Sequence, residues 1–241
     1  IVPKHIGPRE VNTASTYLGH CDDVCLWRRE EKSKVLMHEL GHCLGWDSYP
    51  VPSFVINDFH QHFRIPSQTT CKPNEAYVEL WATLNNCFII ADRLQFSWRE
   101  AVYLEQDFSC WQMAKILHYF GFDSWDDWYG DWIMAQKDNS PFRQTTSALS
   151  YYGIKSLLLF HVRDFMQWIH NHQSQFLFPR TSRTRGVTIW KSYLQWIHAH
   201  FQYRGVNSYS THIEKRLQWF KTHSEKSRWY RNLRMTCLEI V

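Results

Sequence analysis

Two histidines, His38 and His42, lie four residues apart in the sequence, and Glu39 directly follows the first. On an α-helix, residues four apart lie one above the other on the same face. The surrounding positions are apolar, which predicts a largely buried helix over residues 28–44 that ends at Gly45. Buried imidazole and carboxylate groups need partners, so another segment must fold against this helix and supply them.

The rest of the sequence predicts a mainly α fold, with α+β as the alternative. Further helices are expected over residues 74–96, 98–120, 146–170, 188–202 and 210–234. Residues 1–27 contain helix-breaking proline and glycine and are expected to be irregular, with short strands at the very N-terminus and over residues 24–27. Residues 47–73 contain four prolines and are expected to form a long loop, which is uncommon unless the loop is functional.

The formal net charge of +4 is divided unevenly along the 241 residues. Residues 177–241 carry 12 Lys and Arg against three acidic residues, whereas residues 1–176 carry 15 basic and 20 acidic residues. We therefore divide the chain into a motif-bearing domain, residues 1–176, and a basic, aromatic-rich helical extension, residues 177–241, which packs on the same core or stands apart. Arg and Lys interleaved with Trp and Tyr suit binding of RNA or DNA, or docking onto an acidic capsid surface. Amphipathic helices with solvated basic faces have the same composition.

Hydropathy and cysteine content limit the setting in which such a chain works. No apolar run approaches the ~20 residues that cross a bilayer, so no membrane span is expected. The seven cysteines are odd in number and widely scattered, in a chain that is too large to need disulfides. We expect a reducing, intracellular compartment.

Metal binding is the chemistry that fits the histidine pair. His38 and His42 can offer two imidazole nitrogens to one ion, and Glu39, one step round the helix, can reach a water on that ion. This is the HExxH pattern, in which Zn²⁺ lowers the pKa of its water and the glutamate takes the proton. We therefore predict Zn²⁺ as the cofactor, both histidines as ligands and Glu39 as the catalytic base. The alternative is a chance occurrence of the pattern, which the apolar flanks disfavour.

A catalytic zinc site needs a third protein ligand, and three carboxylates are candidates. A metzincin site would have that ligand six residues after His42, but Ser48 stands there and Asp47 is one position early. Glu75 and Glu79 lie four apart on one face of an expected helix. Their segment resembles the Asn-Glu-x-x-x-Asp segment of thermolysin-like enzymes, the gluzincins. The resemblance implies that Glu75 binds the metal and that Glu79 supports a ligand histidine; Glu79 as the ligand ranks second, and Asp47 third.

Tyrosines and further histidines are weaker candidates for the site. Tyr151 and Tyr152, early in the 146–170 helix, could donate a hydrogen bond to a tetrahedral oxyanion, a catalytic role that zinc peptidases need filled. The alternative for both is ordinary core packing. His60 and His62 could touch the metal if the expected 47–73 loop folded over it, and surface positions are the alternative.

A longer ordered pattern extends beyond the motif. It comprises residues 10–12, 28–47, 75–82, 105–109 with Gln112, 115–117, and 150–152 with Lys155. This pattern is similar to a group of predicted metallopeptidases encoded by giant DNA viruses, and it spans about residues 10–170. The resemblance implies a viral origin, a zincin-like helical core and hydrolysis of a peptide or protein substrate. The expected context is viral protein processing or particle assembly, in the host-cell cytoplasm or in the virion.

Two other functions fit the same residues. One is a non-catalytic structural or interaction protein, stabilised by zinc and associated with a viral capsid. The other is a basic nucleic-acid-binding accessory protein, which would act through residues 177–241.

Overall fold

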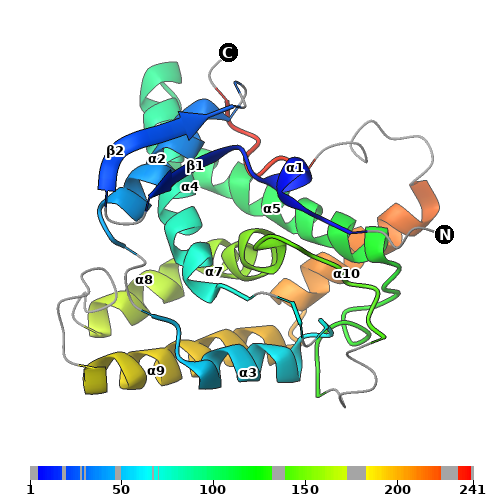
Figure 1. Cartoon of the computed structure of the whole chain (residues 1–241). Helices are drawn as coiled ribbons and strands as arrows, with labels where there is room; N and C mark the ends of the chain where they lie inside the picture. The colour runs from blue at the N-terminus through cyan, green and yellow to red at the C-terminus, as the bar shows by residue number, and fades with distance from the viewer. Residues whose placement is uncertain are drawn as a thin grey trace.

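The computed structural model describes residues 5–17, 20–27, 29, 31–46, 50–66, 68, 69, 71–131, 139–172, 183–223 and 233–239. These residues form a mainly α fold with one two-stranded sheet, as the sequence predicts (Figure 1). In chain order the elements are α1 Pro8–Val11, β1 Ala14–Tyr17, β2 His20–Leu26, α2 Lys32–Cys43, α3 Ser53–His62, α4 Pro73–Leu94, α5 Trp98–Phe120, the π-helix η1 Leu149–Ile154, α7 Lys155–Phe160, α8 Val162–Asn171, α9 Arg183–Gln202 and α10 Tyr209–His223.

The small sheet is an antiparallel hairpin that lies against α2. Ala14 pairs with Leu26 and Thr16 with Val24, and the register shifts after Thr16. Figure 1 shows the hairpin alongside α2, and both of its strands contact that helix. The expected strand at residues 24–27 thus forms the end of β2, whereas residues 8–11 form the short helix α1 instead of irregular chain.

Helix α2 ends as the sequence predicts, at a glycine with a positive φ angle. Gly45 has φ +72°, and its N–H donates to the carbonyl of His42 at 3.0 Å. The next N–H, from Trp46, donates to the carbonyl of Gly41, also at 3.0 Å. These two bonds form a Schellman motif, which satisfies carbonyls that a helix end would otherwise leave unpaired. The motif fixes the end of the helix just beyond the second motif histidine.

Helices α2 and α4 approach each other closely because Gly41 lies at their contact. A Cβ atom at this position would lie 2.7 Å from Val78 Cγ1 and 2.8 Å from the Trp46 ring. Such separations are shorter than van der Waals contact, so a side chain larger than hydrogen would push the helices apart. The glycine therefore lets the HExxH helix lie directly on the helix that carries Glu75 and Glu79.

The long loop expected over residues 47–73 is the main error in the predicted fold, because it contains helix α3. Val55 and Phe59, four residues apart, are completely buried and form the apolar face of this helix. The prolines lie at its N-cap and outside it, where they do not interrupt helical hydrogen bonds.

Two other helix predictions need correction or fall partly outside the described residues. The helix expected over residues 146–170 is divided into η1, α7 and α8, with a break at His161. Helix α9 begins at Arg183, earlier than expected, and α10 ends at His223. Residues 224–232 of the expected last helix lie outside the described residues.

The basic extension shares one hydrophobic core with the rest of the chain. The core includes Ile189 and Tyr193 of α9 and Leu217 and Phe220 of α10, together with residues of α3, α4, α5 and α7. Figure 1 shows α10 beside α5 and α9 beside α3, and both pairs are in contact. Of the two arrangements considered for residues 177–241, the described part adopts the one packed on the common core.

Part of the charge difference between the two regions is used in this packing. Arg204 pairs with Asp126 at 2.6 Å, Lys221 pairs with Asp123 at 3.0 Å, and Arg216 of α10 pairs with an aspartate of α5. Each of these partly exposed pairs contributes only about 0–1 kcal/mol. They nevertheless show that basic groups of the extension neutralise acidic groups of the first 176 residues.

Two further sequence expectations concern the described part of the chain. None of its helices combines the length and the apolar character needed to cross a membrane. Six of the seven cysteines are described there as free thiols, and four of these six are buried.

Candidate metal centre

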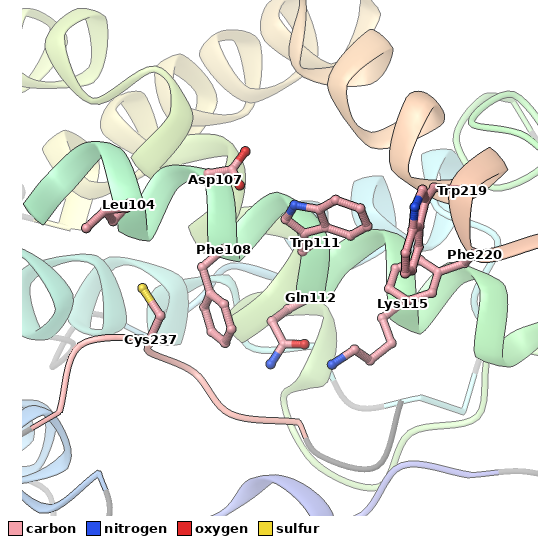
Figure 2. A pocket seen from close by; sticks show the side chains of 9 residues that line it. All are labelled: Leu104, Asp107, Phe108, Trp111, Gln112, Lys115, Trp219, Phe220 and Cys237. Carbon is pink, nitrogen blue, oxygen red and sulfur yellow. The ribbon is translucent and has the colours of Figure 1, made fainter. Parts of the chain in front are cut away.

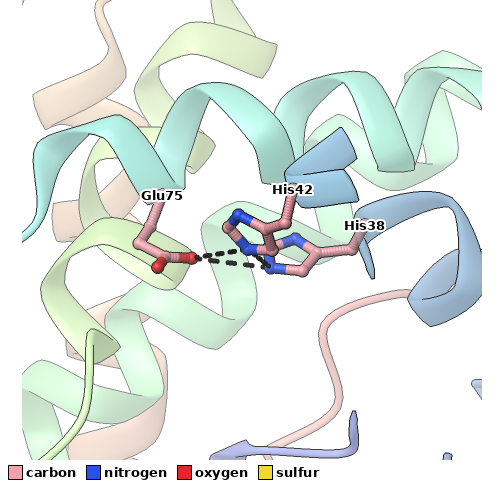
Figure 3. A group of neighbouring side chains, drawn as sticks. All are labelled: His38, His42 and Glu75. Carbon is pink, nitrogen blue, oxygen red and sulfur yellow. Dashed lines mark hydrogen bonds and ion pairs between the residues drawn. The ribbon is translucent and has the colours of Figure 1, made fainter. Parts of the chain in front are cut away.

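Helices α2 and α4 bring His38, His42 and Glu75 together (Figure 3). The two histidine Nε2 atoms are 2.9 Å apart. Glu75 Oε2 lies 3.5 Å from His38 Nε2 and 3.4 Å from His42 Nε2. Both histidines come from one face of α2, and the carboxylate enters from the first turn of α4. Three donor atoms therefore converge on one point.

The separations of these three atoms match the size of a zinc ion. Atoms 2.9, 3.4 and 3.5 Å apart share a point about 1.9 Å from each in their common plane. Zinc lies about 2.0–2.2 Å from histidine nitrogen and from carboxylate oxygen. An ion slightly out of this plane would reach all three atoms at ordinary bond lengths, so the residues present fit the predicted metal.

Glu79 lies one turn further along α4 and contacts the other side of the His38 ring. Its Oε2 is 2.9 Å from His38 Nδ1, and its Oε1 pairs with Lys34 Nζ. A carboxylate that accepts from Nδ1 holds the neutral ring in the tautomer whose Nε2 lone pair is free for a metal. The geometry thus places Glu75 among the three converging donor atoms and Glu79 behind the His38 ring.

Lys34 was not among the predicted site residues, although its spacing offered a signal. It lies four residues before His38, on the same helix face, and is only 1% exposed. A lysine at such a position needs a buried counter-charge, which Glu79 supplies. Lys34, Glu79 and His38 form a continuous buried chain that leads to the donor atoms.

Burial and the charges of the cluster shift the pKa values of Glu75, Glu79 and His38. Burial raises the pKa of Glu75, but hydrogen bonds with both histidines outweigh it and hold that pKa well below its usual range. Burial likewise opposes ionisation of Glu79, yet the Lys34 charge and the His38 hydrogen bond lower its pKa to about 2. For His38, burial lowers the pKa, and the bonds to both glutamates reverse this and raise it. The two carboxylates are ionised, so a metal dication could replace the histidine proton as their counter-charge.

Glu39 is buried beside the cluster and interacts electrostatically with both histidines and with Glu75. Burial raises its pKa above the usual value, and the two histidines partly oppose this shift. A raised carboxylate pKa suits a group that must both accept and return a proton near neutral pH.

Of the two predicted tyrosines, the structure brings Tyr151 to the donor cluster. Its hydroxyl donates to Glu75 Oε2 at 3.1 Å, and its ring lies edge-on to His38. The Tyr152 hydroxyl instead donates to the backbone carbonyl of Leu233 at 2.5 Å. Both belong to the π-helix η1, and Ser150 of the same turn donates to the Lys72 carbonyl just before α4. Single π-helical turns occur often at functional sites, and this one holds Tyr151 against the Glu75 carboxylate.

The other candidate ligands lie elsewhere or outside the described residues. Asp47 and Ser48 are outside the described residues. His60 and His62 belong to α3, and His62 takes part in a different cluster, with Asp58 and His198. The long loop that would have brought His60 and His62 over the site is therefore absent from the described chain, because those residues are helical.

The structure also contains a cavity that does not border the donor cluster (Figure 2). It measures about 390 Å³ and lies between α5, α10 and the C-terminal segment. Its walls are mostly apolar and consist of Leu104, Asp107, Phe108, Trp111, Gln112, Lys115, Trp219, Phe220 and Cys237. Burial lowers the pKa of Lys115 to about 8. Because no donor residue lines this cavity, it is not the place where a substrate would meet the metal.

The chain matches no known family model, no curated protein and no solved structure. The inference of function therefore rests on the HExxH sequence and on the geometry of His38, His42, Glu75 and their neighbours.

Proposed function

We propose that this protein is a zinc-dependent peptidase in which His38, His42 and Glu75 hold the metal. The observation that carries the proposal is the convergence of two imidazole nitrogens and one carboxylate oxygen at separations that suit zinc. Two histidines and a glutamate are a known ligand set of catalytic zinc, with a remaining position for water. Within the described residues, this cluster offers three protein donors, as that arrangement requires.

The residues around the metal have distinct roles in the proposed reaction. When bound, zinc supplies a Lewis acid that polarises the substrate carbonyl and lowers the pKa of water. Glu39 accepts a proton from the attacking water and returns it to the leaving amine. Tyr151 turns its hydroxyl from Glu75 to the carbonyl oxygen as negative charge develops there. Burial and the nearby carboxylates hold the pKa of Tyr151 well above its usual value, so its hydroxyl keeps the proton that it must donate.

A second candidate function is a zinc site that only stabilises the fold. The side chains of His38, His42 and Glu75 are 10, 13 and 10% exposed, which leaves little of the cluster open to solvent. A metal there would join α2 to α4, and much of the binding free energy would then stabilise the fold. This candidate predicts bound zinc without hydrolysis, whereas the peptidase predicts both.

Metal analysis and Glu39→Gln together test the proposal. Purified protein should hold about one tightly bound zinc at the cluster, and His42→Gln should lose it. Glu39→Gln should keep the zinc and abolish hydrolysis of a peptide library, with Glu100→Gln, an exposed change on α5, as the control. The resemblance to viral metallopeptidases makes coat-protein and polyprotein segments the first substrates to include. Zinc binding without cleavage would favour the structural role, and zinc content unaffected by His42→Gln would refute both.

A further inference from the structure

A second group of metal-binding residues lies between α3 and α9. Asp58 and His62 are four residues apart on α3, and His198 faces them from α9. These two helices pack together at the end of the molecule away from α2 and the first cluster (Figure 1). The group is therefore separate from the site of the proposed peptidase, and it does not depend on that function.

The donor atoms of this group are close enough to share one ion. His198 Nε2 is 2.5 Å from Asp58 Oδ2, and His62 Nε2 is 3.8 Å from Asp58 Oδ1. The two histidine rings are 4.4 Å apart and stand edge to face. The side chains of Asp58, His62 and His198 are 25, 20 and 15% exposed, so solvent ions can reach them.

Each histidine also has an oxygen partner on its other ring nitrogen. His62 Nδ1 lies 3.1 Å from Asp131 Oδ1, and His198 Nδ1 lies 2.6 Å from the Tyr129 hydroxyl. Metal-binding histidines almost always donate their second N–H to such a group, which fixes the tautomer and the ring angle. In both rings this leaves Nε2 as the nitrogen that faces the aspartate.

The two outer partners come from one short segment that is fixed to the end of α3. Gly130 N–H donates to the His62 carbonyl at 2.9 Å, and Phe63 and Tyr129 form an isolated antiparallel bridge. The segment therefore places the Tyr129 hydroxyl and the Asp131 carboxylate, which is itself 84% exposed, beside the histidines. Ligands and outer partners are positioned by backbone contacts and not only by side-chain proximity.

A comparable trio, His161, Asp164 and His200, has these features only in part, since His200 Nδ1 lies 2.8 Å from the Trp196 carbonyl but His161 has no such partner among the described residues. Its aspartate is 66% exposed and lies 3.7 and 3.9 Å from the two histidines. Within the described residues, His161 Nε2 is buried without a hydrogen-bond partner, so no second group fixes the orientation of this ring. This trio has the same composition and serves as an internal control.

We propose that Asp58, His62 and His198 bind a transition-metal dication, for which Zn²⁺ is the probe. Two imidazole nitrogens and one carboxylate suit zinc and its neighbours, whereas Ca²⁺ and Mg²⁺ prefer oxygen ligands. The ion would bridge α3, from the first 176 residues, to α9, from the basic extension, and so fix the extension to the core. Without the metal, the 2.5 Å contact is an ordinary His–Asp hydrogen bond, which is the competing interpretation.

Zinc titration of the metal-free full chain, followed by chelator competition, tests the site. Wild-type protein should bind two equivalents, and His42→Gln should retain one. In that background Asp58→Asn or His62→Gln should abolish the remaining equivalent, and Tyr129→Phe should weaken it about 10–100-fold. His200→Gln, from the control trio, should leave it unchanged. The proposal is overturned if His42→Gln binds no zinc, or if Asp58→Asn leaves the remaining affinity intact.

Hydrogen exchange on wild-type protein provides a test that needs no variant. The second zinc equivalent should slow amide exchange in residues 53–62 and 186–202, because the ion links these two helices. Unchanged exchange in both segments would mean that the trio is only a hydrogen-bonded contact. This readout decides the question even if a substitution prevents folding.

Discussion

Replacing Glu79 with glutamine removes the counter-charge of a buried lysine while keeping the shape of the side chain. Glu79 is completely buried, and it contacts Lys34 Nζ through one oxygen and His38 Nδ1 through the other. After the substitution, the Lys34 ammonium would remain buried without the carboxylate that pairs with it, and the sulfur of Met235 lies 3.6 Å from its Nζ. An unpaired buried charge is strongly destabilising, so the folded state should lose much of its stability.

The size of the effect follows from the pKa of the carboxyl group. Burial raises that pKa, but Lys34 and His38 lower it from 4.5 to about 2. At 1.36 kcal/mol per unit, the difference corresponds to about 3 kcal/mol of stability. Breaking one partner of a buried ion pair costs about 3–5 kcal/mol in general, which agrees. Because the folded pKa is the lower one, this stability is present above about pH 4.5 and is lost as the pH falls toward 2.

Urea unfolding of metal-free protein in EDTA, followed by tryptophan fluorescence, measures the loss. Glu79→Gln should reduce the free energy of unfolding at pH 7 by about 3 kcal/mol, and the exposed control Glu100→Gln should change it by less than about 0.5 kcal/mol. Adding Lys34→Met to Glu79→Gln should restore most of the stability, because neither charge is then left alone. A single variant as stable as wild type, or a double variant no better than the single, would refute the charge-pair explanation.

Three further outcomes follow from other contacts. The Cβ atom of Gly41→Ala would separate α2 from α4. The substitution should therefore lower the free energy of unfolding, measured by urea titration, by about 1–3 kcal/mol. It should also weaken zinc binding, measured by chelator competition. Tyr151→Phe should lower kcat about 10–100-fold with zinc retained, because its hydroxyl contacts Glu75. Tyr152→Phe should lower the free energy of unfolding and leave the zinc site unchanged, because its hydroxyl bonds the Leu233 carbonyl. Equal kcat losses in the two variants would contradict the role given to Tyr151. Burial and the neighbouring His200 lower the pKa of His161 from 6.5 to about 4. As the pH is lowered, His161 therefore becomes protonated in the unfolded chain before it does in the folded protein. The free energy of unfolding should fall between pH 6.5 and pH 4 for this reason. Urea midpoints at pH 7 and pH 5 should show this fall, and His161→Asn should reduce it.

Periodic helices and their end signals were predictable from the sequence, whereas α3 was not. Gly45 and Gly121 both end helices with positive φ angles, and Ser97 caps the start of α5. These are local effects of single residues, and they act wherever the chain folds. The prolines and polar residues around α3 made its apolar face hard to recognise in the sequence. Val55 and Phe59 are only two of its ten residues, and their burial against distant segments stabilises the helix.

The donor cluster was predictable in composition but not in its surroundings. Spacing of four residues placed His38 over His42 and Glu75 over Glu79, so one helix contact was enough to join them. Which glutamate lies beside the two histidine Nε2 atoms depends on the crossing of α2 over α4, and that crossing depends on the close approach at Gly41. The orientation of Tyr151 depends on a π-helical turn, for which the sequence has no periodic signal.

The C-terminal segment explains how so many charges can be buried near this cluster. Met235 and Thr236 donate backbone N–H groups to Glu31, while Cys237 and Leu238 donate theirs to Glu105. Carboxylates that accept several N–H hydrogen bonds are stable in a protein interior. The backbone N–H groups of this segment therefore take the place of water around Glu31 and Glu105. The same segment accepts from Lys155, whose Nζ lies 3.3 Å from the Met235 carbonyl. A boundary at residue 176 therefore divides the charge of the sequence but not its hydrophobic core, because residues 233–239 form hydrogen bonds with buried charged groups beside the helices of the donor cluster.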